Sequence, residues 1–303
     1  MGKATRGTAA AIIERPLSPR EVTTDHLTRM GQRPALGDYL RDLWRRREFV
    51  WEIAVNDLRA RNMDTVLGGL WHLLNPLLLA AVYYVVFGVI LNARRGIGDY
   101  PAFLLIGITV LFYSTKSLAS GARSIVNSYG LITNLYFPRA IVPISTVTAE
   151  FFSHLWALVG ILTIVAIMTR DVTIAWVLVV PIALLQTLFN LGLAFITARL
   201  TSHVRDVQHL LPYVTRIWFY LSGIFFAVES QTGLGGDLLR LNPGWVFVHL
   251  TRLAVGVAHT EDVVVPYSAT SPSLWGIAAA WSFGLLVVGF LFFRHHETGY
   301  AGD

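Results

Sequence analysis

Three ionisable side chains lie inside otherwise apolar stretches of this sequence: Lys116, Glu150 and Arg216. A charge within a membrane-spanning segment is costly, so it usually pairs with another charge or faces water. Lys116 lies near one end of its stretch and can extend to the membrane surface. Glu150 lies deeper, and the two can form a stabilising pair between adjacent antiparallel helices. We therefore predict that Lys116 and Glu150 are buried charges with a structural role.

An alternative role for Glu150 is proton transfer. His154 follows it by one helical turn, on the same face of a helix. Carboxylate and imidazole groups in membrane helices form proton relays in pumps and transporters. This alternative makes the chain a proton-coupled carrier, although a single carboxylate gives it little support.

Motifs for hydrolytic or covalent chemistry are missing. The sequence has no GxxxxGK[ST] loop, and its only lysines are Lys3 and Lys116. HExxH and GxSxG are absent, and without cysteines there are no disulfides, thiolate metal sites or iron–sulfur clusters. The pair His295-His296 is too weak a pattern to indicate a metal. We expect no enzyme activity, no cofactor and no metal site in this chain.

Aromatic side chains, 12% of the sequence, recur at helical spacing in two apolar stretches. One stretch carries Tyr83, Tyr84 and Phe87, and the other carries Tyr213 and Tyr220. Flat aromatic faces can hold sugars by stacking, without strict demands on sequence. The alternative is that these rings pack between helices or sit in the interfacial belts of a membrane protein.

The elements that position these side chains are predicted to be membrane helices. Hydrophobic residues make up 54% of the chain and charged residues 14%, against about 25% charged in a soluble domain. A helix needs about 20 apolar residues to cross the bilayer. Six stretches qualify, approximately 70–91, 101–120, 141–168, 173–198, 210–228 and 274–293. We therefore predict an all-α membrane protein with six transmembrane helices.

The distribution of basic residues predicts the orientation. Of the 24 lysines and arginines, twelve precede residue 62, ahead of the first span. With six spans, Arg123, Arg139, Arg199, Arg205 and Arg294 join these twelve on the side of the termini, against five arginines on the opposite side. This excess indicates that both ends are cytoplasmic in the plasma membrane. The net charge of +5 reflects this topology, and we predict no nucleic-acid binding.

Four further segments are not spans. Residues 1–36 are rich in Thr, Pro and Arg and are predicted to be a disordered cytoplasmic tail. Residues 37–61 predict an amphipathic helix in the headgroup layer, or alternatively a packed surface helix. Residues 127–137 predict a short apolar cytoplasmic helix that contacts a partner protein, or else a turn resting on lipid. Residues 233–256 form two pieces too short to span, which predicts an outer re-entrant helical hairpin or an extracellular loop.

Three segments carry a family resemblance: LGGLWHLLNP, SLASGARSIVNSYGLI and LYFPRAIVP. From about Leu36 to the C-terminus the sequence resembles the ABC-2 type permeases of polysaccharide export, the O-antigen and teichoic-acid exporter group. Within that group it is most similar to the Wzm permeases of actinobacterial and mycobacterial galactan export. The resemblance makes residues 37–303 one ABC-2 type transmembrane domain.

The resemblance implies a homodimer joined to two copies of a separate Wzt-like ABC ATPase, which binds the ATP and Mg. It also implies that a lipid-linked glycan moves between the two permeases, in contact with membrane lipid. In this sequence it places the ATPase-coupling helix at Asn127, Tyr129, Leu131, Ile132, Leu135, Tyr136, Phe137 and Arg139.

The same resemblance assigns three further sites. The interface helix would attract a lipid diphosphate headgroup through Arg45, Arg46 and Arg47. The channel would be lined by the aromatic residues Tyr83, Tyr84, Phe87, Tyr213 and Tyr220. The outer gate helices would include Leu239, Asn242, Pro243, Trp245 and Phe247. An ABC-2 permease for a drug or a simple lipid is the alternative within the same architecture.

Overall fold

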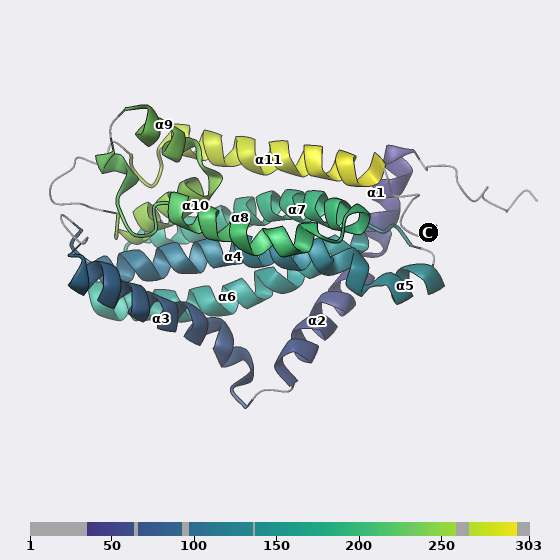
Figure 1. Ribbon diagram of the computed structural model, residues 1–303, viewed down its shortest axis with the longest axis horizontal. Coiled ribbons are helices and arrows are strands. Elements are labelled where there is room, and N and C mark those ends of the chain that lie inside the picture. The colour runs from purple at the N-terminus through teal and green to yellow at the C-terminus, as the bar shows by residue number, and fades with distance from the viewer. Residues whose placement is uncertain are drawn as a thin grey trace, which may run out of the picture.

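The computed structural model describes residues 35–63, 66–92, 97–135, 137–231, 233–258 and 267–295. Within these ranges every regular element is a helix, which confirms the predicted all-α class. Most of the long helices run side by side along the long axis of the molecule, whereas the first two helices of the chain lie across it or oblique to it (Figure 1). Residues 1–34 of the predicted tail and Tyr136 of the predicted coupling helix lie outside the described residues.

Five helical segments in the described ranges are long and apolar enough to cross a membrane. They coincide with five of the six predicted spans. In chain order they are η2 (Gly68–Leu70), α3 (Trp71–Tyr83) and the π-helical η3 (Tyr84–Ile90) as one segment, α4 (Tyr100–Asn127), α6 (Ile141–Thr169), η4 (Ile174–Leu178) with α7 (Val179–His203), and α11 (Pro272–His295).

The helix found in the predicted span 210–228 ends earlier than predicted. Its helix α8 (Val207–Leu221) has 15 residues with Pro212 inside, and it is followed by turns up to η5 (Val228–Ser230). Fifteen helical residues extend about 22 Å, less than the roughly 30 Å hydrocarbon core. Helix α8 nevertheless packs against α4 within the bundle. A sixth crossing therefore stays a prediction.

Helix α4 forms the centre of the bundle and contacts α3, α6, α7, α8 and α10. Small residues allow its closest crossing, because a Cβ on Gly121 would lie 2.6 Å from the Cβ of Ala194 on α7. Helices α7 and α11 approach in the same way: a Cβ on Gly192 would lie 2.5 Å from the backbone of Leu285. Such backbone contact is how membrane helices associate where lipid gives no hydrophobic drive.

The predicted interface helix 37–61 is interrupted. It consists of α1 (Leu36–Arg45) and α2 (Arg47–Met63), which are separated by a turn at Arg46. Helix α1 buries Tyr39, whose ring lies 6.0 Å from Phe290 near the end of α11. Helix α2 packs on α6, with Ala54 fully buried. The N-terminal helix and the end of α11 therefore lie at the same end of the bundle, beside α5 (Tyr129–Asn134) (Figure 1).

Two short helices lie at the opposite end of the bundle (Figure 1). They are α9 (Leu234–Leu241) and α10 (Pro243–Val255), and they meet at Asn242, where the sequence predicts a break. Almost all of α10 is buried, whereas α9 exposes Leu234 and Leu238. Whether this pair re-enters a bilayer stays a prediction.

Candidate functional site

A polar cleft of about 790 Å³ lies among α2, α3, α4 and α6. Its walls come from the last three turns of α4 and the first three turns of α6, so it lies at the end of the bundle that carries α5. Hydrogen-bonding and charged side chains line most of it, including His72, Lys116, Ser120, Arg123, Thr146 and Glu150.

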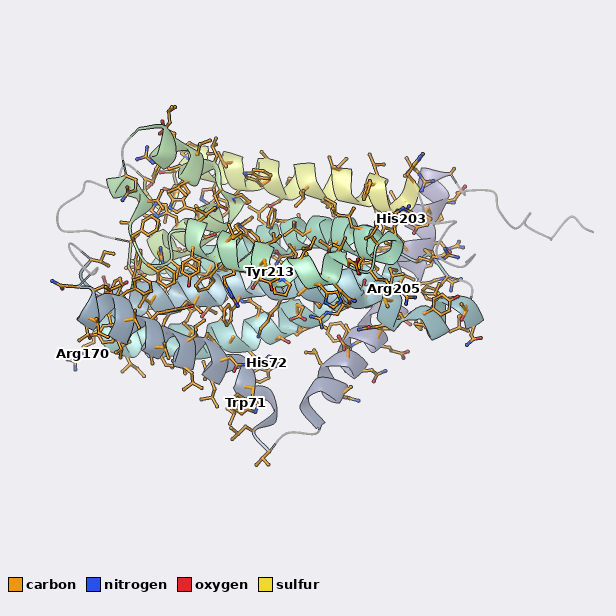
Figure 2. The ribbon with its side chains drawn as sticks, in the orientation of Figure 1. Trp71, His72, Arg170, His203, Arg205 and Tyr213 are labelled. Carbon is orange, nitrogen blue, oxygen red and sulfur yellow. The ribbon has the colours of Figure 1, made fainter. Side chains whose placement is uncertain are left out.

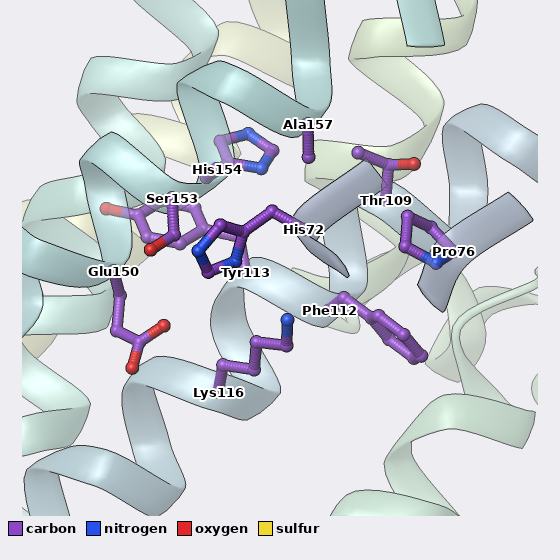
Figure 3. Close-up of a pocket in the computed structure, with 10 residues that line it drawn as sticks. All are labelled: His72, Pro76, Thr109, Phe112, Tyr113, Lys116, Glu150, Ser153, His154 and Ala157. Carbon is purple, nitrogen blue, oxygen red and sulfur yellow. The ribbon is translucent and has the colours of Figure 1, made fainter. Parts of the chain in front are cut away.

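The cleft adjoins a smaller cavity deeper in the bundle, and both are lined by His72, Lys116 and Glu150 (Figure 3). Lys116 comes from α4 and Glu150 from α6, which are adjacent as the sequence predicts. Glu150 is 4% exposed and nine residues from the start of α6, about 13 Å along its axis. Glu150 is thus buried, whereas Lys116, which lines the same cavity, is only partly buried and not buried as predicted, because it also borders the wider cleft.

His154 lies beyond these charges in the same cavity. Its ring stacks on Tyr113 with a centroid distance of 4.5 Å, and it is 6% exposed. The Tyr113 hydroxyl donates to Thr187 Oγ1 at 2.9 Å. Gln186 Nε2, on α7 next to Thr187, donates to Val110 O and Ser114 Oγ at 2.8 and 2.9 Å. The interior between α4, α6 and α7 is therefore polar and well connected.

The predicted coupling segment divides into exposed and buried residues. Helix α5 is six residues long, shorter than the predicted 127–137, and Asn127 is the last residue of α4. Tyr129 and Leu135 are 50% and 51% exposed. Asn127 is exposed as well. The remaining described members of the segment are partly or fully buried: Leu131, Ile132, Phe137 and Arg139.

The buried members anchor the segment to the bundle. Phe137 is 7% exposed and meets Phe49 of α2 edge to face at 5.6 Å. Ile132 packs into the same cluster and is also 7% exposed. In this chain, Ile132 and Phe137 therefore hold α5 in place, and Tyr129 and Leu135 are available to a partner.

The three arginines at the turn between α1 and α2 differ in their surroundings. Arg46 Nε lies 3.7 Å from Asp42 Oδ2, so part of its charge is compensated within the chain. Arg45 and Arg47 are exposed, and the Arg47 guanidinium lies 5.6 Å from the centre of the Trp44 ring. Two cations at this turn can thus meet an anion from outside.

The predicted channel aromatics occupy two kinds of place. Tyr83 and Phe87 pack against Phe225, with centroid distances of 4.8 and 4.3 Å. Tyr84 is partly buried and its ring lies 6.5 Å from that of Tyr100. Phe225, in the turns after α8, belongs to the same cluster. The sequence analysis did not single it out, because it does not follow the helical spacing of Tyr213 and Tyr220.

Tyr213 and Tyr220 belong to the second kind of place. They lie on the open face of α8, where they are 66% and 46% exposed. Figure 2 labels Tyr213 on this face. The sequence placed both on one helical face, and the structure shows that face uncovered within the single chain.

Asn242 fixes the tip of the hairpin. Its Oδ1 accepts hydrogen bonds from Gly244 N at 2.9 Å and from Trp218 Nε1 of α8 at 2.8 Å. Its Nδ2 donates to Leu221 O at 2.9 Å. Pro243 begins α10, where a missing N–H costs nothing. The predicted gate residue Asn242 thus ties the hairpin to α8.

The remaining predicted gate residues differ in burial. Trp245 and Phe247 are each 1% exposed, and the Phe247 ring lies 5.5 Å from that of Phe189 on α7. Leu239, on α9, is half-buried. Movement of a gate here would have to displace the core contacts of α10.

Arg252 is a buried charge that sequence reasoning missed. It lies near the end of α10 and is 2% exposed. Its guanidinium donates to the carbonyls of Phe103, Gly223 and Ile224 at 3.1, 2.8 and 3.1 Å. One side chain therefore joins α10 to α4 and to the turns after α8.

A second buried polar pair lies beside it. His249 Nδ1 is 2.7 Å from Glu229 Oε1, and Trp245 stacks on the His249 ring at 4.7 Å. Burial acts to raise the pKa of the Glu229 carboxyl, but the hydrogen bond and charge of His249 outweigh it, so this pKa lies below its ordinary value. Glu229 is thus held as a carboxylate that fixes η5 to α10.

Comparisons with known proteins agree with this architecture. The ABC-2 type transporter family matches residues 49–254. The O-antigen export system permease protein RfbA of Myxococcus xanthus is 28% identical over 209 residues, which cover 67% of this chain and 78% of the relative.

Two further relatives are similar over most of this chain. RfbA of Klebsiella pneumoniae is 28% identical over 63% of this chain and 73% of its own length. The polysialic acid transport protein KpsM of Escherichia coli is 25% identical over 80% of this chain and 91% of its own length. Since the family match covers more than half of the sequence, the chain belongs to the ABC-2 type transporter family.

Proposed function

We propose that this chain is the membrane-spanning permease subunit of an ATP-driven exporter of lipid-linked polysaccharide. The observation that carries the proposal is the family match together with three relatives named for O-antigen export or polysialic acid transport. The chain brings no nucleotide-binding loop of its own. Energy is therefore supplied by a separate ABC ATPase that binds ATP and Mg.

The partner ATPase, which is Wzt-like, docks on α5. Two exposed apolar side chains, Tyr129 and Leu135, project there from a segment that Ile132 and Phe137 hold rigidly. A rigid element with an exposed apolar contact can transmit movement of a partner into α4 and α6, which flank it. Two ATPase copies act on a homodimer of this chain.

The substrate is a glycan joined to a polyprenyl diphosphate, and the resemblance to galactan permeases favours galactan. Arg45 and Arg47 attract the diphosphate at the membrane surface. The aromatic residues of α3 and α8 line the sugar path between two copies, and the pair α9 and α10 forms the outer gate. This gate lies in the outer leaflet as a re-entrant hairpin.

Six crossings place both termini in the cytoplasm, with α8 and the turns after it as the fifth. The contact of Tyr39 on α1 with Phe290 on α11 supports this topology, because it brings both ends of the described chain to one end of the bundle. The protein is then a multi-pass protein of the plasma membrane.

Depletion of the protein in its host tests the substrate. If the proposal holds, lipid-linked polymer accumulates on the cytoplasmic side of the membrane, and galactose in that polymer identifies galactan. Impaired growth without any accumulated polymer would instead favour an ABC-2 permease for a drug or a simple lipid.

The polar interior supports one other function, a proton-coupled carrier. Glu150, His154 and Tyr113 line one cavity deep in the bundle (Figure 3), as a proton relay requires. Transport driven by a pH gradient and abolished by Glu150→Gln would establish it. Under the exporter proposal, Glu150→Gln lowers stability but leaves transport dependent on ATP.

A further inference from the structure

Arg216 is an exposed arginine on α8, nine residues after the start of the helix and about 13 Å along its axis. In the proposed topology, where α8 and the turns after it form the fifth crossing, this places it near the middle of the bilayer. Within the part of the chain that the structure describes it forms no ion pair. A charge at this depth is costly against lipid tails, so the side chain is expected to face a polar path or a partner.

The neighbours of Arg216 form a stripe along the open face of α8. Tyr213 and Tyr220 lie at i−3 and i+4 from it, which places the three side chains on one side of the helix. Ile217, on the same face, is 61% exposed. The side chains of Leu211 and Phe219, on the opposite face, are 8% exposed and pack into the bundle.

A second helix contributes to the stripe. Tyr83 on α3 and Tyr220 on α8 both pack against Phe225, with centroid distances of 4.8 and 5.5 Å. The Arg216 guanidinium is close enough to interact with the Tyr83 phenol. One cation and two phenol groups therefore converge where the chain leaves the face of α8 uncovered.

We propose that Arg216, with Tyr83 and Tyr220, is a binding station for the diphosphate of a polyprenyl-linked glycan as it crosses the membrane. The inference rests on the proposed function. A guanidinium binds phosphate oxygens through two parallel hydrogen bonds, and phenol groups add donors beside it. A diphosphate that crosses an apolar core needs such a cation at mid-depth, because its charge is otherwise unsolvated there.

A direct contact between two copies of this face does not explain Arg216 well. If two copies present the face to one shared path, two guanidinium groups enter it, and their repulsion is relieved only by an anion between them. The arrangement thus fits an anionic ligand better than a dry helix contact.

The test uses the complex of this chain with its partner ATPase in proteoliposomes, with ATP hydrolysis measured against added polyprenyl diphosphate. Polyprenyl monophosphate and uncharged polyprenol are the comparison ligands. In Arg216→Gln the half-stimulating concentration of the diphosphate should rise roughly tenfold or more, because a charge-assisted contact is lost. Arg216→Lys should lose less, because it keeps the charge.

Arg205→Gln is the matched control. It removes an exposed arginine at the turn before α8, away from the stripe, and should respond like the wild type. If polyprenyl diphosphate stimulates ATP hydrolysis in Arg216→Gln as it does in the wild type, the binding station is refuted. Dissociation of the dimer in both Arg216 variants would also overturn it, since the cation would then be a contact between copies.

The same preparation distinguishes failure of the diphosphate-binding station from failure of the proposed export function. A wild-type complex that exports lipid-linked glycan but does not respond to the diphosphate leaves the export function standing and removes the station. A wild-type complex that exports no glycan removes the export function itself, whatever Arg216 does.

Discussion

The hairpin of α9 and α10 is held by Arg252, and the contact depends on a glycine. A Cβ on Gly107 of α4 would collide with the Arg252 guanidinium, which donates to three backbone carbonyls. We therefore expect Gly107→Val to lower the free energy of unfolding by about 1–3 kcal/mol, as overpacking does. Thermal unfolding in detergent measures this loss. Gly276→Val is the control, because nothing lies within 4 Å of the added Cβ, and an equal loss in both variants would contradict the assignment.

Glu229 gives the stability of this region a dependence on pH. Its pKa in the folded protein lies below the ordinary value of 4.5, so the carboxylate stabilises the fold above that value. The stabilisation is lost as the pH falls through the folded-state pKa. The wild type should therefore unfold at a higher temperature than Glu229→Gln at about pH 7, and this difference should shrink toward about pH 4. A difference that grows on acidification would contradict the pairing with His249.

At the scale of residues, the sequence predicted some sites better than others. Lys116 and Glu150 were predictable because a charge in an apolar run is conspicuous, and adjacent spans bring the two together. Arg252 was not, because its partners are carbonyls of Phe103 and Gly223, far away in sequence. Backbone acceptors carry no signal in side-chain patterns.

At the scale of elements, the contact between α7 and α11 depends on small residues. Gly192 allows the backbone of α11 to approach directly. Gly192→Val should separate the two helices and lower the thermal unfolding temperature of the protein in detergent, whereas Gly284→Val, whose Cβ meets nothing within 4 Å, should not. If both variants melt like the wild type, close backbone packing does not hold α11.

Helix α5 is expected to carry the contact with the ATPase. Leu135→Asp places a charge on its exposed apolar surface, so binding of the ATPase should weaken roughly tenfold or more while the permease folds normally. Co-purification and ATPase titration measure the effect. Leu238→Asp changes a leucine at the opposite end of the bundle that is 69% exposed, against 51% for Leu135, and this variant should bind the ATPase normally. Normal binding by Leu135→Asp would refute the docking site.

The elements themselves were largely predictable, because five apolar runs of about 20 residues specify five long helices. The break between α1 and α2 was not predicted, because the apolar positions of 37–61 continue through Arg46. The shortness of α8 was missed as well, because the sequence stays apolar beyond Leu221 while the chain turns there. Asn242 binds Leu221 O at that point, and this long-range contact cannot be derived from local composition.

At the scale of the whole molecule, the described chain leaves three features uncovered: the open face of α8, the exposed residues of α5 and the polar cleft. Under the proposed function they meet a second copy, an ATPase and the substrate, respectively. We propose that ATP hydrolysis by the partner drives lipid-linked glycan through two copies of this chain.

Reconstitution tests that claim most directly. Proteoliposomes would contain this chain and its partner ATPase, and the appearance of lipid-linked glycan in the opposite leaflet would be measured with and without ATP. We predict transport that requires ATP and the ATPase, persists when the pH gradient is collapsed, and fails with Leu135→Asp. Transport by this chain alone, driven by a pH gradient and lost in Glu150→Gln, would contradict the account.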